Sequence, residues 1–400
     1  MPPRDARLPL PDASWRTRFR RRLRSWYEGN ARDLPWRRSR DPYRVWVSEI
    51  MLQQTQVATV KPYFGRFIDA FPTVEALARA DESRVLRLWE GLGYYRRARQ
   101  MHEAARRIVE EHGGRFPRDR DSVRDLPGVG RYTAGAILSI ALDAREPILE
   151  ANTIRLFCRL LAYGGPPRAK EGQTLLWAMA EWVLPPREPG LFNQSLMELG
   201  SEVCRNGTPR CSACPVESLC EARRRGVETR IPLPATKPNF EYRREAAVLI
   251  RRQGRVLLVR CPDGGRWAGL WDFPRHELMA ENELLRRDEL VEKVRKQTGL
   301  TVELGECLRT IKHGVTRYKI TLECHETTRV SGRLKTLAEQ AMQWVRPSDL
   351  ADYPLSSTGR KLSRLTLEST ASRAVPRRVE EDCVIGDRRG KSNRMTLNVR

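Results

Sequence analysis

Four cysteines just past the middle of the chain have the spacing of metal ligands. They form Cys204-x6-Cys211-x2-Cys214-x5-Cys220, a span of seventeen residues. Thiolates this close together bind Zn²⁺ or an iron–sulfur cluster. Zinc ribbons usually present two C-x-x-C pairs, whereas this loop has one, and the spacing alone leaves zinc and cluster open. The odd total of nine cysteines argues against a secreted disulfide framework and for a reducing compartment.

One glutamate lies in an unusually apolar segment. Glu49 is flanked by valine, tryptophan, isoleucine, methionine and leucine within Val45–Leu52. Burial raises the pKa of a carboxyl group, so that it holds a proton near neutral pH and can act as a general acid. The alternative is a structural glutamate paired with an arginine. If Pro42–Val60 is one helix, Gln53 and Gln56 share the face of Glu49.

A second acid, Glu150, follows an apolar approach and precedes Asn152 by two residues. This pattern indicates the start of a helix, where polar atoms are held in place. The nearby Asp143 and Glu146 look like surface turn residues. Two carboxyl groups in different environments, one protonated and one ionised, suit the cleavage of glycosidic bonds. The pair alone does not specify a substrate.

Leu126–Gly130 (LPGVG) precedes an amphipathic segment that begins at Arg131. Two glycines in this spacing permit a tight turn, and the helix start that follows offers unpaired N–H groups to an anion. The motif resembles the helix-hairpin-helix element that holds a DNA phosphate without reading sequence. An ordinary turn between helices is the alternative.

The composition points to a polyanionic partner. The 400 residues include 73 Lys and Arg against 50 Asp and Glu, a formal charge of +23. Nucleic acid is the commonest partner of such a chain, although a solvated arginine-rich surface gives the same count. No apolar run approaches the length of a membrane span, and no signal peptide is visible. We expect a soluble, cytoplasmic protein that makes no use of membranes.

The periodicity divides the chain into two structured parts. Apolar residues recur at three- and four-residue steps from 15 to about 225, which predicts helices throughout. Short runs rich in β-forming residues follow, with one helical segment, Glu281–Gln297, between them. We predict an N-terminal extension (1–14), a helical region (15–225), a linker (226–241), an α/β domain (242–366) and a basic, flexible tail (367–400).

Several of the motifs, taken together, resemble those of a known protein family. WVSEIMLQQTQV (46–57), GLGYY (91–95), LPGVG and the cysteine loop are similar to the MutY family of adenine DNA glycosylases. GGRWAGLWDFP (264–274) resembles the Nudix-like domain of that family. The resemblance implies a mainly α helix-hairpin-helix glycosylase domain with a [4Fe–4S] loop and a C-terminal α/β Nudix-like domain. It is dense over residues 15–225 and looser beyond them.

The resemblance also implies a function. The family removes adenine mispaired with 8-oxoguanine or guanine in double-stranded DNA, in base excision repair. We expect a monomeric, monofunctional glycosylase of the bacterial nucleoid, with Cys204, Cys211, Cys214 and Cys220 holding the cluster. The implied catalytic residues are Glu49, Glu150, Asn152 and Tyr132, and the implied adenine pocket is Leu34, Trp36, Arg37 and Gln194. The residues implied to contact DNA or the lesion are Gln54, Thr55, Leu92, Tyr94, Gly128, Gly130, Thr316 and Arg317.

The resemblance assigns roles to the catalytic set. Glu49 would protonate the departing adenine at N7, and Glu150 would stabilise the oxocarbenium-like sugar. Asn152 would help to position the water, and Tyr132 would pack at the reaction centre. The family usually has Asp in a D-G-N sequence where this chain has Glu150-Ala151-Asn152. Glutamate keeps the charge but adds a methylene and a rotor.

Three further positions separate this chain from related enzymes. Bifunctional endonuclease III-like enzymes carry lysine at the position of Tyr132, and without that amine no Schiff base can form there. The family's Phe-Ser-His triplet is replaced by His313–Tyr318 (HGVTRY). Hydrolytic Nudix enzymes bind metal through clustered glutamates, whereas this chain offers Glu292, two lysines and Gln297. We therefore predict no pyrophosphatase activity and a role in inspecting the base opposite adenine.

Two alternatives remain open. One is an endonuclease III-like pyrimidine glycosylase/lyase, which Tyr132 and the C-terminal domain disfavour. The other is a catalytically impaired DNA-binding homologue, motivated by Glu150 and the altered triplet.

Overall fold

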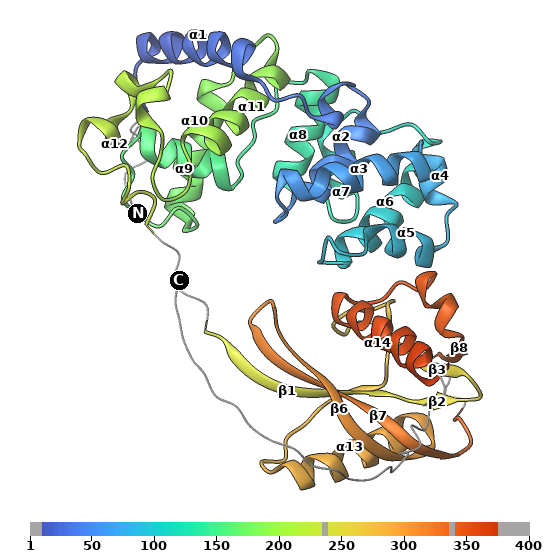
Figure 1. The fold of residues 1–400 in the computed structure, drawn as a ribbon. Coiled ribbons are helices and arrows are strands. Elements are labelled where there is room, and N and C mark those ends of the chain that lie inside the picture. Colours follow the sequence, from blue (N-terminus) through green and yellow to red (C-terminus); the bar gives the residue numbers. More distant parts are fainter. Residues whose placement is uncertain (1–9, 234–238, 336–340, 375–400) are drawn as a thin grey trace, which may run out of the picture.

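A computed structural model describes residues 10–233, 239–335 and 341–374. The first half is helical and the second half combines strands with helices, as the sequence predicts. The helices of this half form two groups (Figure 1), and each group packs around its own hydrophobic core. Parts of the expected extension, linker and tail lie outside the described residues, and the expected domain boundaries stay predictions.

The first core is built by the helices between residues 35 and 142. Its largest fully buried side chains include Trp46, Phe67, Trp89 and Met101. Proline and glycine residues separate short amphipathic segments, so the chain turns often and each helix buries one face. The elements are η1 (Pro35–Arg37), α2 (Pro42–Leu52), α3 (Val57–Ala70), α4 (Val74–Ala78), α5 (Glu82–Trp89), α6 (Arg96–His112), α7 (Arg120–Asp125) and α8 (Arg131–Leu142).

The second core joins the first helix to the helices after residue 150. Phe19 and Leu23 of α1 (Ala13–Asn30) pack with Phe157, Leu176 and Leu196. The chain therefore contributes α1 to the second core, then builds the first core, and returns to the second core after residue 148. The remaining elements are α9 (Ala151–Leu160), α10 (Lys170–Val183), α11 (Pro189–Glu198), the π-helical η2 (Leu199–Val203), η3 (Cys211–Ala213), η4 (Glu217–Leu219) and α12 (Glu221–Arg224).

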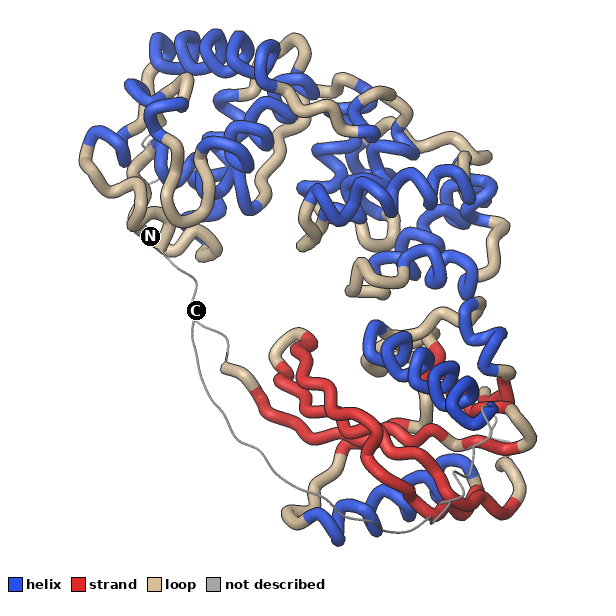
Figure 2. The backbone as a smooth tube through the Cα atoms, in the orientation of Figure 1, coloured by secondary structure: helices blue, strands red, loops and turns tan. Residues whose placement is uncertain are grey.

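The C-terminal domain contains two small sheets. One has the strand order β5–β1–β7–β6, with β1 parallel to β7, and the other joins β2, β3, β4 and β8. Helices α13 and α14 lie on opposite sides of the strands (Figure 2). The elements are β1 (Glu241–Leu249), β2 (Arg251–Arg252), β3 (Arg255–Arg260), β4 (Trp271–Asp272), β5 (Arg275–Glu277), α13 (Glu283–Thr298), β6 (Leu300–Val315), β7 (Tyr318–Gly332), β8 (Met342–Val345), η5 (Pro347–Ala351) and α14 (Ser357–Ala374).

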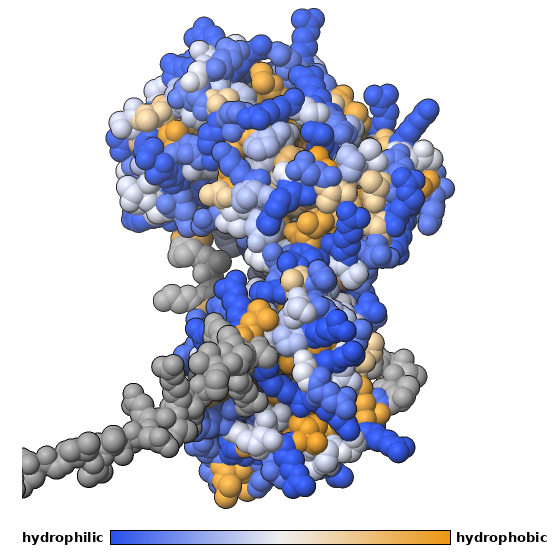
Figure 3. Space-filling view, turned by 45° about the vertical axis from the view of Figure 1, so that its right-hand side comes forward, coloured by the Kyte–Doolittle hydropathy of each residue, from blue (hydrophilic) through white to orange (hydrophobic). Residues whose placement is uncertain are grey.

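The two domains meet at a narrow waist (Figure 3). Glu90, at the end of α5, accepts a bidentate ion pair from Arg360 of α14, with N–O distances of 2.6 and 2.9 Å. The Tyr95 hydroxyl donates to the Leu355 carbonyl at 3.3 Å, and Leu270 is buried in the first helical core. The C-terminal domain thus contacts the residues that flank 91–94 in the sequence, Glu90 before them and Tyr95 after them.

Three sequence expectations differ from the structure. Pro42–Val60 is not one helix, because α2 ends at Leu52 and a turn separates it from α3. Gln56 is the N-cap of α3, so it does not share a helical face with Glu49. The long strand β6 was not expected.

Candidate active site

The first acid is held inside the first core. Asp41 caps α2 by accepting a hydrogen bond from the Tyr43 backbone N–H, and Pro42 occupies the first turn. All residues from Val45 to Met51 are buried, so Glu49 is only 4% exposed. Burial raises the pKa of Glu49 to about 7, although the Tyr132 hydroxyl donates to Glu49 Oε2 at 2.6 Å and opposes the rise.

The second acid is the N-cap of α9. Its carboxylate accepts hydrogen bonds from the backbone N–H groups of Asn152 at 2.8 Å and Thr153 at 2.9 Å. The Thr153 hydroxyl accepts from the Glu150 backbone N–H, which completes a capping box. Burial raises the pKa of Glu150, and the two backbone donors oppose the rise. The helix N-terminus favours a negative charge at this position, so we expect Glu49, rather than Glu150, to be the protonated acid near neutral pH.

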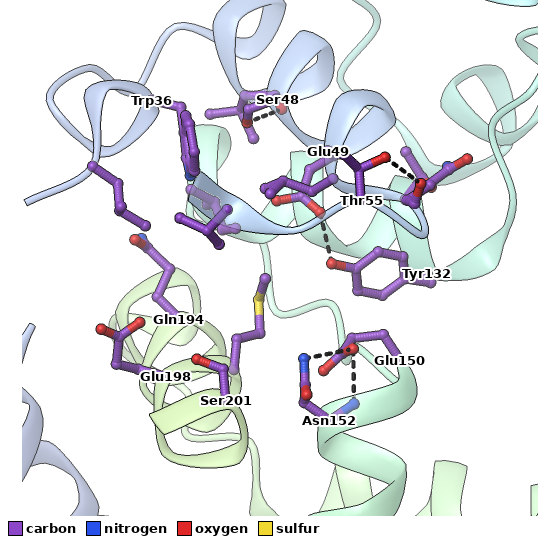
Figure 4. Close-up of a pocket in the computed structure, with 18 of the residues that line it drawn as sticks. Trp36, Ser48, Glu49, Thr55, Tyr132, Glu150, Asn152, Gln194, Glu198 and Ser201 are labelled. Atoms are coloured by element: carbon purple, nitrogen blue, oxygen red, sulfur yellow. Dashed lines mark hydrogen bonds between the residues drawn. The ribbon is translucent and has the colours of Figure 1, made fainter. Parts of the chain in front are cut away.

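Both acids line one cavity of about 520 Å³, which lies between the two helical cores. This volume falls in the range of roughly 300–1,000 Å³ typical of small-molecule sites. Figure 4 shows Glu49 above and Glu150 below the same space, with the Tyr132 hydroxyl between them. The predicted site residues in the lining are Leu34, Trp36, Arg37, Glu49, Gln54, Thr55, Gly130, Tyr132, Glu150, Asn152 and Gln194.

A buried ion-pair network that the sequence did not reveal supports one wall of the cavity. Glu198, at the end of α11, is fully buried and accepts from Arg32 at 2.7 Å and from Arg37 at 2.8 Å. These two partners lower the pKa of Glu198 against the effect of burial. The network fixes Arg37 beside the Tyr27 ring, 5.7 Å from its centroid. No local pattern marks Glu198, because its partners lie more than 160 residues away.

Asn152 is positioned by a second unexpected residue. Arg155 donates to Asn152 Oδ1 at 2.9 Å, to the Gly200 carbonyl at 2.6 Å and to the Cys204 carbonyl at 2.7 Å. A Cβ atom on Gly200 would lie 2.8 Å from the Asn152 Cβ, so only glycine allows η2 to pack this closely. The π-helical geometry of η2 is typical of functional sites.

The predicted phosphate-binding hairpin joins α7 to α8. Gly128 has φ +79°, a conformation that favours glycine, and Gly130 is the N-cap of α8. Gly130 and Tyr132 reach the cavity wall, whereas Gly128 does not line it. The first N–H groups of α8 therefore lie at the edge of the site, where a phosphate can bind.

Two further predicted residues, Leu92 and Tyr94, lie outside the cavity lining. They belong to the loop between α5 and α6. Leu92 is buried, whereas Tyr94 is 51% exposed and has φ +48°. Gln54, in the turn after α2, also has a positive φ of +56°. The structure thus presents Tyr94 on the surface, free to contact a partner.

Thr316 and Arg317 form the tip of the β6–β7 hairpin, outside the cavity. Thr316 has φ +51°, and Arg317 pairs with Glu241 at 2.8 Å and lies 5.2 Å from the Tyr318 ring centroid. On α13, Glu292 pairs with Arg295. Lys293, at a position where hydrolytic Nudix enzymes need an acid, contacts Glu289 at 2.7 Å.

The four clustered cysteines line a second cavity. Cys204, Cys211, Cys214 and Cys220 face the same space together with Arg159, which donates to Cys204 Sγ at 3.3 Å. Burial raises the pKa of Cys214 to about 12 and that of Cys220 to about 11, so a bound cation is needed to hold them as thiolates. Within the described residues no set of acidic, histidine or cysteine side chains is spaced for a single metal ion.

Two family models match the chain. Residues 47–181 match the HhH-GPD superfamily of base excision DNA repair proteins, and residues 246–365 match the NUDIX domain. The first match covers Glu49, Tyr132, Glu150 and the hairpin. The second covers most of the C-terminal domain.

The chain is similar along most of its length to curated adenine DNA glycosylases. The protein of Rattus norvegicus is 35% identical, over 87% of this chain and 78% of the relative. The chain belongs to the adenine DNA glycosylase family. The protein of Homo sapiens is 36% identical, over 87% of this chain and 74% of the relative, and that of Arabidopsis thaliana is 33% identical, over 92% and 67%.

Family membership confirms the fold and the enzyme class expected from the motifs. The protein is a DNA glycosylase of base excision repair, and its substrate is DNA. A solved thermostable thymine-DNA glycosylase covers 54% of this chain and 100% of its own, at 30% identity and a TM-score of 0.50. None of the described helices combines the length and apolar character needed to cross a membrane.

Proposed function

We propose that this glycosylase hydrolyses the N-glycosidic bond of adenine mispaired with 8-oxoguanine or guanine in double-stranded DNA. One observation carries the proposal: a buried acid with a pKa of about 7 and a second acid bound by backbone N–H groups line the same cavity. The first can deliver a proton near neutral pH, and the second can face a developing cation.

The reaction follows from this arrangement. Glu49 gives its proton to N7 of an extruded adenine, and the bond between C1′ and N9 breaks with its electron pair on the base. The sugar becomes an oxocarbenium-like cation, which the Glu150 carboxylate stabilises. Water held by Asn152 adds to C1′, and its released proton returns to the Glu49 carboxylate. Tyr132 donates to Glu49 and therefore fixes the acid's orientation.

The adenine pocket is assigned to the opposite wall of the cavity. Leu34 and Trp36 are buried there, and Gln194 offers an amide to the base edge. Tyr94 is exposed and can insert into the duplex, which offsets part of the cost of extruding a base. Gln54 and Thr55 would face the lesion strand, Leu92 would support this surface from the core beneath it, and Gly128 and Gly130 would hold a phosphate.

The C-terminal domain is assigned to the base opposite adenine. Thr316 supplies a hydroxyl and Arg317 a guanidinium at the exposed hairpin tip, where the family has its Phe-Ser-His triplet. Its α13 carries Lys293 and Lys296 where Nudix hydrolases bind metal, so we assign it no hydrolytic activity.

The cysteine loop is assigned a [4Fe–4S] cluster held by Cys204, Cys211, Cys214 and Cys220. Four thiols line one cavity, and their C-x6-C-x2-C-x5-C spacing resembles the cluster loop of endonuclease III-type glycosylases, which favours a cluster over zinc. The cluster would crosslink the loop. The surrounding arginines, rather than the anionic cluster, would attract DNA.

Single-turnover excision tests the proposed function. The duplexes carry adenine opposite 8-oxoguanine, guanine or thymine, and the variants are Glu49→Gln and Glu146→Gln. Glu146 is a matched control, because it pairs with Arg120 outside the cavity. We expect excision only opposite 8-oxoguanine and guanine, a loss of at least about 100-fold in Glu49→Gln, and no change in Glu146→Gln. Equal rates for wild type and Glu49→Gln would contradict the mechanism. Trapping by borohydride on abasic DNA would instead indicate a lyase.

A further inference from the structure

One arginine of α6 joins two segments that are far apart in sequence. Arg97 Nη1 donates to the carbonyl oxygens of Ile50 at 2.7 Å, Met51 at 3.1 Å and Gln53 at 2.6 Å. Its Nη2 donates to the Thr55 hydroxyl at 3.3 Å and to the carbonyl oxygens of Leu92 and Gly93, both at 3.2 Å. A single guanidinium thus binds the end of the helix that carries Glu49, the turn after it, and the loop that carries Tyr94.

The charge of Arg97 is balanced without a carboxylate. In the described part of the chain it forms no ion pair, and its guanidinium lies 5.3 Å from the Trp89 ring centroid and 5.7 Å from that of Tyr94. The carbonyl groups at the end of α2 form the negative pole of that helix, which a buried cation complements. Burial lowers the pKa of Arg97 to about 10, so the group stays charged at neutral pH.

Each of the two segments contains a strained residue. Gln54 has φ +56° and Tyr94 has φ +48°, a left-handed conformation that is unfavourable for residues with a side chain. Such conformations persist only where the surroundings hold them, and they concentrate at sites that clamp a ligand. Gln54 and Tyr94 are also the residues that the proposed function places against DNA. Arg97 contacts the backbone directly beside both.

We propose that Arg97 is a positioning residue for base extrusion, which fixes the turn at 53–56 relative to the loop at 91–94. The two segments would then meet the duplex as one rigid surface, with Tyr94 inserted while Gln54 and Thr55 contact the opposite strand. This inference rests on the proposed function. Arginine is required because its planar fork reaches both segments at once, whereas lysine donates from a single point.

The chain offers a matched control arginine. Arg20 of α1 donates to the carbonyl oxygens of Trp182 at 3.2 Å, Val183 at 2.8 Å and Leu184 at 2.7 Å, at the end of α10. Burial lowers the pKa of Arg20 as well. This arginine therefore holds a helix end as Arg97 does, but its helix α1 packs in the second core, apart from the α2–α3 and α5–α6 connections (Figure 1).

The experiment compares Arg97→Lys with Arg20→Lys. Extrusion is followed by the fluorescence of 2-aminopurine placed where the adenine would be, opposite guanine, and excision is followed in single turnovers on the matching adenine duplex. We expect Arg97→Lys to slow both by about 10- to 100-fold, with the pH dependence of excision unchanged. Arg20→Lys should lower the melting temperature and leave both rates as in wild type. An Arg97→Lys protein that melts lower but extrudes the base at the wild-type rate would overturn the proposal.

Two features keep this test separate from that of the proposed function. A wild-type protein that extrudes 2-aminopurine but leaves the glycosidic bond of adenine intact would refute the proposed function and not the role of Arg97. If Arg97→Lys fails to fold, Thr55→Val removes the side-chain hydroxyl that accepts a hydrogen bond from the guanidinium. Amide hydrogen exchange in the free Thr55→Val protein should then rise in residues 53–56 and 91–95 together, with Thr55→Ser as its control. Unchanged exchange in both segments would contradict the proposal that Arg97 holds the two segments together.

Discussion

The hydrogen bond from Tyr132 to Glu49 predicts how the excision rate responds to pH. Glu49 must carry a proton to act, and its pKa is about 7. The rate should therefore fall about tenfold per pH unit above neutrality. The Tyr132 hydroxyl stabilises the charged form of Glu49, because it donates to Oε2 at 2.6 Å. Removing the hydroxyl in Tyr132→Phe must raise the pKa and move the alkaline limb to higher pH.

The size of the shift follows from the strength of the bond. A hydrogen bond to a charged group contributes about 1.5–3 kcal/mol. One pKa unit corresponds to about 1.4 kcal/mol, so the limb should move up by about one to two pH units. Glu49 is 4% exposed, so solvent cannot replace the lost donor without rearrangement. The height of the rate plateau can also fall, because Tyr132 packs in the cavity, but the position of the limb is independent of that height.

The assay is single-turnover excision at subsaturating protein, which reports the pKa of the free enzyme. Tyr43→Phe is the control, because the buried Tyr43 hydroxyl donates to the Phe71 carbonyl at 2.7 Å and does not face the cavity. Its alkaline limb should coincide with that of wild type. A limb that stays in place in Tyr132→Phe, or that moves to lower pH, would refute the assignment of Glu49 as the acid.

Three other changes give independent predictions. The folded-state pKa of Glu49 is raised from its ordinary 4.5 to about 7, so wild-type stability falls as pH rises from about 4.5 to 7. Denaturant titration should therefore give Glu49→Gln a free energy of unfolding that exceeds the wild-type value by on the order of 3 kcal/mol above neutrality. Below pH 4.5 the two proteins should differ little. Glu150→Gln should slow excision by about 100-fold or more, whereas Glu150→Asp, which keeps the charge and the N-cap, should stay within about tenfold of wild type. Glu90→Gln leaves Arg360 without its carboxylate, and we expect calorimetry to show a separate, earlier transition of the C-terminal domain after a loss of about 3 kcal/mol.

The sequence predicts those parts of the site that have local signals. Glu49 is marked by the apolar residues around it, and Glu150 by the polar residue two positions later. The turn after α2 has no glycine or proline to mark it, so Gln53–Gln56 reads as helix. Strand β6 combines polar residues with a register irregularity near Cys307, which obscures its alternation.

Contacts between distant segments could not be predicted in this way. Glu198 looks like an ordinary helical glutamate, and only the fold shows that it is fully buried against Arg32 and Arg37. Arg97 likewise belongs to a basic run in the sequence, although the structure makes it the donor to two segments. When the partners of a side chain are more than forty residues away, the sequence around it shows no pattern that marks the contact. Its role can be recognised only once the fold places the partners beside it.

The contacts of Arg155 explain how a cysteine loop that is remote from the chemistry can affect it. Arg155 donates to the Cys204 carbonyl and, through Nη2, to Asn152 Oδ1. Asn152 in turn donates its side-chain amide to Glu150 Oε2 at 3.2 Å. If the loop around Cys204 moves, Arg155 loses one of its two backbone acceptors and holds Asn152 less firmly, whereas Glu150 keeps its two backbone N–H donors. We therefore expect the loop to affect catalysis through Arg155 and Asn152, a route that involves no electron transfer.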